Sequence, residues 1–204
     1  MPCCNNSGSG DCLLSACVVK ISKNQIYNLS LLVFAVLVLF TPVGTAVKVW
    51  VNRLVAVSPF RTPEEHRENI GSYHWDLRTQ DGGIYDFSNA RDKVVLINFW
   101  ATWCPPCIAE MPALHRLYKD YGNKVVFLFV TGEDPETVRE FLRRKEWDIP
   151  AYFPLTSAPE KIYSSSIPVT WVLNKKGDIV IGKKGVAAWD SDEVRDILDV
   201  LIAE

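Results

Sequence analysis

Residues 98–107 read NFWATWCPPC, and this stretch decides the fold. It continues an apolar run, 94–100, whose length and β-rich composition predict a buried central strand. The two prolines then open a helix expected over 105–121, because proline is tolerated in a first helical turn. Two cysteines, three positions apart, therefore lie where a strand ends and a helix begins.

Cys104 and Cys107 are the candidate redox pair. A spacing of three on a helix places both sulfur atoms on one face, within reach of a disulfide bond. Free N–H groups and the positive end of the helix dipole stabilise a thiolate at a helix start, which lowers the pKa of Cys104 from about 8.5 toward 7. We therefore expect Cys104 to attack a substrate and the more buried Cys107 to resolve the mixed disulfide.

Pro105 and Pro106 limit this stabilisation. Neither has an N–H group, so the backbone N–H of Cys107 is the principal donor left for the thiolate of Cys104. The sequence thus predicts a moderately lowered pKa and a reducing or intermediate redox poise rather than that of a strong oxidant.

A zinc site is the alternative interpretation of two cysteines at this spacing. Structural zinc takes about four ligands, usually with a second cysteine pair. His115 lies eight residues beyond Cys107, too far along the helix to complete a site with it. The other cysteines match no familiar ligand spacing and are expected to be unpaired thiols: Cys3, Cys4, Cys12 and Cys17. The sequence predicts no metal site and calls for no cofactor.

Residues 29–47 contain no charged side chain. A helix of this length rises about 28 Å, close to the hydrocarbon thickness of a bilayer, and it would be apolar on every side. We predict a single transmembrane anchor over 29–51, preceded by a polar N-terminal tail, 1–28, and followed by a linker, 52–69. A cleaved signal peptide is the main alternative, because small residues follow the apolar core.

The orientation of this anchor rests on two conflicting indications. Lys48, Arg53 and Arg61 after the span outnumber Lys20 and Lys23 before it, which favours a cytoplasmic C-terminal domain by the positive-inside rule. Large domains, however, translocate largely regardless of charge, and the dithiol suits an oxidising compartment. We expect the domain on the extracytoplasmic side of the cytoplasmic membrane, and the charge count leaves the opposite orientation open.

Residues 70–204 are expected to form one folded domain of the α/β class that begins with a β-hairpin. The hairpin signal is the turn Asp81-Gly82-Gly83. Strands are predicted at 73–77, 84–87, 94–100, 125–130, 151–155, 169–173 and 179–181. Helices are predicted at 105–121, 135–145, 159–163 and 191–202. Strands that alternate with helices predict a central mixed sheet covered on both faces by helices.

The motif 98–107, followed by Glu110 and Pro112, resembles the membrane-anchored thioredoxins of the TlpA/ResA type. The resemblance extends over 70–204 and implies a thioredoxin-like fold. It also implies reduction of disulfide-bearing protein substrates outside the cytoplasmic membrane, among them apocytochrome c during cytochrome c maturation. The electrons would come from a membrane thiol transporter of the DsbD/CcdA kind.

The resemblance also assigns roles to single residues. Ile167-Pro168 is expected to be a cis peptide facing the dithiol, where the backbone pairs with a substrate chain. Trp103 and Pro105 are placed with it on the substrate-binding surface. Glu110 matches an acidic residue that influences thiol protonation.

Asn98 cannot serve as a base, so Glu110 is the natural substitute for that role. Ordinary thioredoxins carry a buried aspartate at that position, and asparagine cannot accept a proton. Two tryptophans, Trp171 and Trp189, are expected to be core residues. Trp100 and Trp103 are expected to pack around the dithiol, as core and rim.

Composition excludes some functions and leaves others open. A net charge of −2 without a basic stripe argues against nucleic-acid binding. A peroxidase is disfavoured, because no Pro-x-x-x-Thr pattern is present. Two alternatives stay open: a disulfide oxidase or isomerase, which a reduction potential near −120 mV would favour, and a non-enzymatic metal or haem-handling chaperone.

Overall fold

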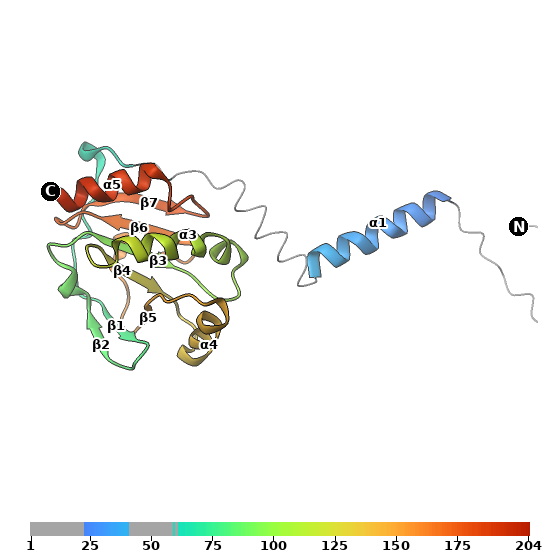
Figure 1. Cartoon of the computed structure of the whole chain (residues 1–204), viewed down its shortest axis with the longest axis horizontal. Helices are drawn as coiled ribbons and strands as arrows, with labels where there is room; N and C mark the ends of the chain where they lie inside the picture. Colours follow the sequence, from blue (N-terminus) through green and yellow to red (C-terminus); the bar gives the residue numbers. More distant parts are fainter. Residues whose placement is uncertain (1–22, 41–58, 60) are drawn as a thin grey trace, which may run out of the picture.

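The computed structural model describes residues 23–40, 59 and 61–204 (Figure 1). Residues 61–204 contain a seven-stranded sheet in the order β2-β1-β5-β4-β3-β6-β7. Its strands are β1 (Asp76–Thr79), β2 (Ile84–Asp86), β3 (Val95–Phe99), β4 (Val126–Val130), β5 (Ala151–Pro154), β6 (Val169–Leu173) and β7 (Ile179–Lys184). The helices are α1 (Lys23–Phe40), α3 (Pro105–Tyr121), α4 (Pro135–Lys145) and α5 (Asp192–Ala203), with 3₁₀ turns η1 (Glu64–His66), η2 (Phe87–Ala90) and η3 (Glu160–Ile162).

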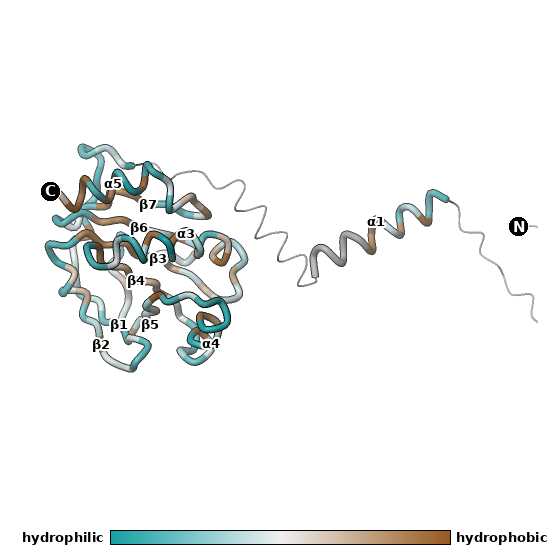
Figure 2. Tube along the Cα trace, viewed as in Figure 1, coloured by the Kyte–Doolittle hydropathy of each residue, from teal (hydrophilic) through white to brown (hydrophobic). Residues whose placement is uncertain are grey.

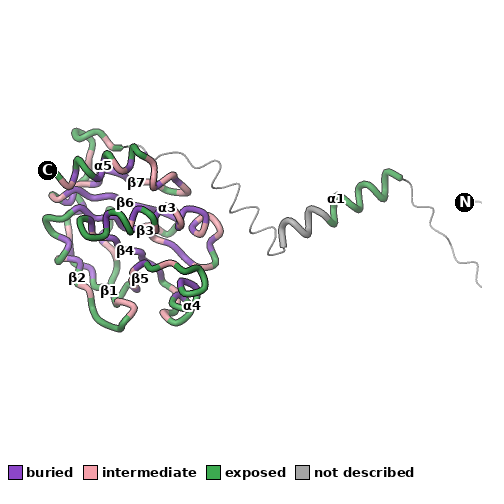
Figure 3. The backbone as a smooth tube through the Cα atoms, viewed as in Figure 1, coloured by how far each residue is buried: buried purple, intermediate pink, exposed green. Residues whose placement is uncertain are grey.

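The sheet is mixed, as expected. β3 pairs in parallel with β4, with Ile97 opposite Leu128, and β4 pairs in parallel with β5. β3 pairs in antiparallel with β6, and hairpins join β1 to β2 and β6 to β7. The first four residues of the central strand β3 are buried, and the strand lies in the interior of the domain (Figures 2 and 3). Its alternate side chains enter opposite faces of the sheet, as those of Leu96 and Ile97 do.

Two hydrophobic cores lie on the two faces. The helix-side core takes residues from three helices, among them Met111 of α3, Phe141 of α4 and Leu198 of α5. The opposite core is covered by the 3₁₀ turns, through Phe87 of η2 and Ile162 of η3, and by the chain before β1. Among the described residues it receives nothing from α3, α4 or α5.

The expectation of helices on both faces therefore holds only in part, because the α-helices α3, α4 and α5 cover one face and only short 3₁₀ helices cover the other. α3 connects β3 to β4 and α4 connects β4 to β5, so both crossovers step across the sheet in the same direction. Right-handed crossovers that step in one direction lie on one face. Strand and helix periodicity does not reveal this, because it depends on the order of the strands in the sheet.

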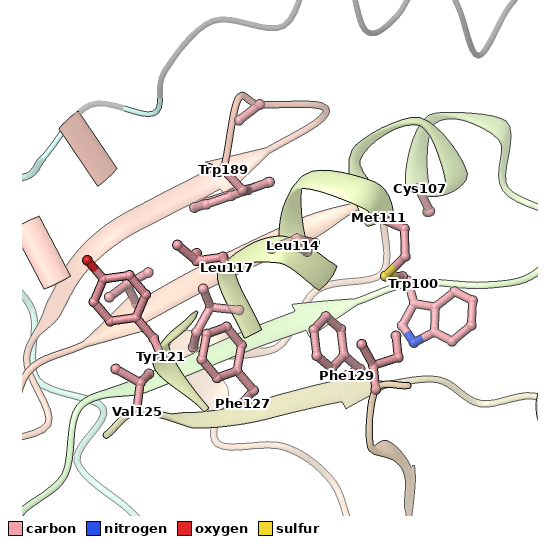
Figure 4. Close-up of a cluster of buried hydrophobic side chains, with 14 of the residues drawn as sticks. Trp100, Cys107, Met111, Leu114, Leu117, Tyr121, Val125, Phe127, Phe129 and Trp189 are labelled. Carbon is pink, nitrogen blue, oxygen red and sulfur yellow. The ribbon is translucent and has the colours of Figure 1, made fainter. Parts of the chain in front are cut away.

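α3 packs on the sheet through one apolar stripe. Met111, Leu114 and Leu117 are fully buried and share the helix-side core with Phe127 and Phe129 of β4 (Figure 4). Each buried side chain of this size contributes roughly 1.5–3 kcal/mol. The stripe fixes the rotation of α3 and so determines which residues of its first turns face the sheet.

Most predicted boundaries hold, and α3 and α4 have the bounds that were expected. The first strand begins at Asp76 rather than at residue 73, although Tyr73 and Trp75 are buried in the opposite core. The helix expected at 159–163 is only the short turn η3. η2 was not predicted, and the side chain of Asp86 caps it by accepting from the N–H of Ser88.

The predicted linker, 52–69, contains residues that belong to the folded domain. The N–H of Thr62 donates to the carbonyl of Val180 at 2.7 Å, and the N–H of Ile179 donates to the carbonyl of Glu68 at 2.8 Å. The side chain of Asn69 donates to Asp178 at 2.8 Å. Residues 62–69 therefore lie along β7, and the boundary expected at residue 70 is several residues late.

The N-terminal helix α1 begins at Lys23, earlier than the predicted anchor. Within the described part of the chain, no helix has the length and apolar character needed to cross a membrane. The second half of the predicted anchor, residues 41–51, lies outside the described residues, as do residues 1–22 with their four cysteines. The anchor and its orientation stay predictions.

Candidate active site

Cys104 and Cys107 form a disulfide bond at the start of α3, with their Cα atoms 5.3 Å apart. Cys104 is the N-cap residue, and its sulfur accepts from the backbone N–H of Cys107 at 3.3 Å. Pro105 and Pro106 occupy the first two helical positions. The N–H of Cys107 is therefore the donor to Cys104 that the sequence predicted.

An exposed indole lies next to the disulfide in the sequence. Trp103 is 70% exposed, whereas Cys104 is 3% exposed and Cys107 is fully buried. Cys107 is thus the more buried of the two, but in the disulfide form the difference is small. Trp100 is buried beneath the pair, against the ring of Phe141.

The peptide bond between Ile167 and Pro168 is cis, as expected. Val169, the first residue of β6, pairs with Phe99, the last residue of β3, and β3 leads directly to the dithiol. The cis-proline and the dithiol therefore lie at the same end of the sheet. Pro168 is buried, whereas Ile167 is only partly covered.

Glu110 is buried at 2% exposure, between α3, β3 and the segment before α5. Its Oε1 accepts from Asn98 Nδ2 at 3.0 Å, and its Oε2 accepts from Trp189 Nε1 at 2.9 Å. Burial raises the pKa of Glu110 to about 7, although the bonds from Trp189, Asn98 and the Ala187 backbone and the charge of Lys183 oppose the shift. The structure therefore places a buried carboxyl with a raised pKa at this position.

Asn98 of β3 links Glu110 to the sheet by hydrogen bonds. Its Nδ2 atom also donates to Thr170 Oγ1 of β6 at 2.8 Å. Its Oδ1 atom is buried and has no hydrogen-bond partner in the part of the chain that the structure describes. Asn98 therefore acts as a donor toward Glu110 and keeps an unused acceptor.

A small cavity of about 180 Å³ lies beside Glu110, between α3 and the segment before α5. Arg116 and Asp190 line it and form an ion pair, with Nε donating to Oδ2 at 2.6 Å. The cavity is large enough to hold water molecules next to Glu110. Its other lining residues are Ala109, Pro112, Ala113, Val186, Ala187 and Ala188.

Sequence reasoning missed two contacts at this site. Trp189 is core, as expected, but it is also a hydrogen-bond donor to Glu110. Glu133 accepts from Thr102 twice, from the backbone N–H at 2.6 Å and from Oγ1 at 2.7 Å, and so holds the turn before Cys104. The partners are 79 and 31 residues apart, and no local pattern indicates either pairing.

Comparison with known proteins agrees with this geometry. A model of the AhpC/TSA family matches residues 73–189. The chain is 35% identical over 115 residues to the thioredoxin-like protein YneN of Bacillus subtilis, a match that covers 53% of this chain and 68% of YneN. It is 32% identical over 107 residues to the thiol-disulfide oxidoreductase ResA of Halalkalibacterium halodurans, which covers 51% of this chain and 61% of that protein. Part of each relative therefore lies outside the match.

A solved structure of a DsbF homologue from Corynebacterium diphtheriae shares the fold. Its TM-score is 0.57 at 20% sequence identity, and the match covers 69% of this chain and 93% of that one. The sheet order, the helix that starts at the disulfide and the cis-proline are consistent with this likeness. The chain belongs to the AhpC/TSA family, as a ResA-like protein with the thioredoxin-like fold.

Proposed function

We propose that this chain is a thiol–disulfide oxidoreductase that reduces disulfide bonds of protein substrates through Cys104 and Cys107. The observation that carries the proposal is the disulfide at the start of α3, with a buried carboxyl one helical turn further along. The relatives also support the proposal, since YneN is called a thioredoxin-like protein and ResA a thiol-disulfide oxidoreductase.

The reaction begins with the reduced dithiol. The thiolate of Cys104 attacks one sulfur of the substrate disulfide, and the other sulfur leaves and takes up a proton. Cys107 then gives its proton to the carboxylate of Glu110, and its thiolate attacks Cys104 Sγ. The second substrate sulfur leaves and takes up the proton that Glu110 received, so that the substrate gains two electrons and two protons in all and the protein ends as the disulfide with Glu110 again a carboxylate.

The poise of this pair is proposed to be reducing. Within the residues that the structure describes, the donor to Cys104 Sγ is the backbone N–H of Cys107, because the two preceding helical positions are prolines. A thiolate with few donors stabilises the reduced form only weakly, which keeps the potential low. The buried carboxyl of Glu110 acts in the same direction, since its negative charge disfavours a nearby thiolate.

Substrates would bind over Trp103, Pro105, Ile167 and Pro168. Trp103 is the exposed aromatic side chain beside the disulfide, and the cis-proline lies at the same end of the sheet. Apocytochrome c is one candidate substrate in this class, and a membrane thiol transporter of the DsbD/CcdA kind is the proposed electron donor.

A location follows from the same proposal. Residues 29–51 would anchor the chain in the lipid bilayer of the cytoplasmic membrane and leave the domain outside. The support is the uncharged stretch 29–47, part of which is the helix α1. A reporter that is active only when exported, fused after Glu204, should be active, and activity of a cytoplasm-only reporter would reverse the orientation.

The activity is tested by trapping the intermediate. Cys107→Ser should accumulate a mixed disulfide between Cys104 and a substrate protein, which mass spectrometry of the complex identifies. Cys104→Ser is the matched control and should trap nothing. If neither variant loses the ability to reduce a protein disulfide, the dithiol is not the reductant and the proposal fails.

A further inference from the structure

Trp189 differs from three other tryptophans, whose indole nitrogens are also buried, in having a hydrogen-bond acceptor. The Nε1 atoms of Trp75, Trp100 and Trp171 are buried and have no partner in the described part of the chain. Trp189 is fully buried, and its Nε1 donates to Glu110 Oε2 at 2.9 Å. The ring therefore makes a polar contact with a buried carboxylate that lies one helical turn after Cys107.

We propose that Trp189 is a positioning residue for thiol–disulfide exchange, which holds the carboxylate of Glu110 in the orientation that accepts the proton of Cys107. The inference rests on the proposed function and adds a residue to it. It applies to the proton-transfer step that precedes attack by Cys107.

The hydrogen bonds fix the carboxylate from two sides. Asn98 on β3 donates to Oε1, and Trp189, which precedes α5, donates to Oε2. The backbone N–H of Ala187 adds a third donor from the same segment as Trp189. Because each oxygen has its own donor, the carboxylate cannot turn without breaking a bond to a charged group, and such bonds are among the stronger ones in proteins.

The same bonds determine when the carboxylate is charged. Burial raises the pKa of Glu110 to about 7, and the largest opposing contribution is the bond from Trp189. Without the bond from Trp189, less opposes the effect of burial, and the pKa of Glu110 rises further. The base form of Glu110 is then available only at higher pH.

Other charged and titratable groups also face this carboxylate, and a shift in its pKa can be attributed to Trp189 only if their charges do not change. Lys183 on β7 lowers the pKa of the carboxyl by its charge. Arg116 of α3 and Asp190, before α5, line the adjacent cavity as an ion pair. Cys104 and Cys107 are the titratable groups in the first turn of the same helix.

The experiment compares Trp189→Phe with Trp75→Phe in the full chain. Both variants shorten a fully buried indole to a phenyl ring, but only the first removes a hydrogen bond. The measurement is the single-turnover rate at which Cys107 resolves a preformed mixed disulfide on Cys104, recorded across pH. A thermal melt of each variant confirms that it is folded.

Trp189→Phe should move the midpoint of the pH profile upward, and Trp75→Phe should leave it in place. A rise of about one pH unit from 7 lowers the carboxylate fraction at pH 7 from a half to about a tenth, a roughly fivefold loss of rate. In a Glu110→Gln background, Trp189→Phe should cause no further shift.

An unchanged midpoint in Trp189→Phe would overturn the positioning role, as would an equal shift in the Glu110→Gln background. Neither result affects the proposed function, which depends on trapping by Cys107→Ser. If the unsubstituted dithiol resolves no mixed disulfide at any pH, it is the proposed function that fails.

Discussion

At the scale of single residues, Glu110 is a buried carboxyl held by polar groups of the domain. Its carboxyl lies one helical turn beyond Cys107 and is held by donors from β3 and from the segment before α5. Glu110→Gln should slow release of the mixed disulfide by about 10²-fold, the range of a lost general base. Thiol titration of the reduced protein should at the same time show lower cysteine pKa values, because a negative charge is gone.

The control for this variant is Glu193→Gln, which removes an exposed carboxylate from the first turn of α5. It should alter neither the titration nor the rate. If Glu110→Gln behaves like this control, the carboxyl takes no part in proton transfer.

The raised pKa of Glu110 also predicts a pH dependence of stability. The folded value, about 7, lies above the unfolded value near 4.5, so between these two pH values the folded state binds more protons. Stability from this group is present below pH 4.5 and is lost as pH rises through 7, by on the order of 3 kcal/mol in total. Urea unfolding of the oxidised protein should therefore show a fall over this range that is absent in Glu110→Gln, and parallel curves would refute it.

The site shows which residues a sequence can indicate. Cys104, Cys107 and Pro168 are indicated by a local motif or by the resemblance that the motif establishes. Glu110 is indicated by the same resemblance, whereas its burial and its raised pKa come from the structure. Trp189 donates across 79 residues, and no local pattern indicates that contact.

At the scale of elements, the turn between β3 and α3 is held by a carboxylate from another loop. Glu133 follows β4 and accepts from both the N–H and the hydroxyl of Thr102. Glu133→Gln replaces an acceptor pair with a single acceptor oxygen, and we expect a loss of about 1–3 kcal/mol in the free energy of unfolding. Denaturant titration measures it.

A double-mutant cycle with Thr102→Val shows whether this loss comes from the pair. Thr102→Val removes the hydroxyl bond but keeps the backbone one, so it should cost less than Glu133→Gln, and the two losses should not add. Additive losses would mean that Glu133 stabilises the turn by another contact.

The elements themselves were largely predictable, because α3 and α4 carry clear periodicity and proline starts. The errors are short or irregular segments. η2 has four residues and depends on a cap by Asp86, and β1 begins later than the apolar pattern that contains Trp75. Trp75 is buried although it lies before the strand. Alternation of apolar residues cannot tell a buried residue outside a strand from one inside it.

At the scale of the whole molecule, the arrangement of layers was the part that the sequence could not provide. All three long helices of the domain contribute to one core, and 3₁₀ turns cover the other face. This follows from strand order, which in turn depends on long-range pairing such as β1 with β5. Residues 62–69 likewise join the domain through backbone bonds to β7 and the residues beside it, contacts that a polar linker composition does not indicate.

The central claim is that the Cys104–Cys107 pair is a protein disulfide reductant. The most direct test is its equilibrium reduction potential, measured by incubating the protein in thiol redox buffers of graded ratio and quantifying the free thiols of Cys104 and Cys107 by alkylation and mass spectrometry. The account predicts a potential well below about −200 mV, in the range of reducing thioredoxins. A potential near −120 mV would identify an oxidant and contradict the account.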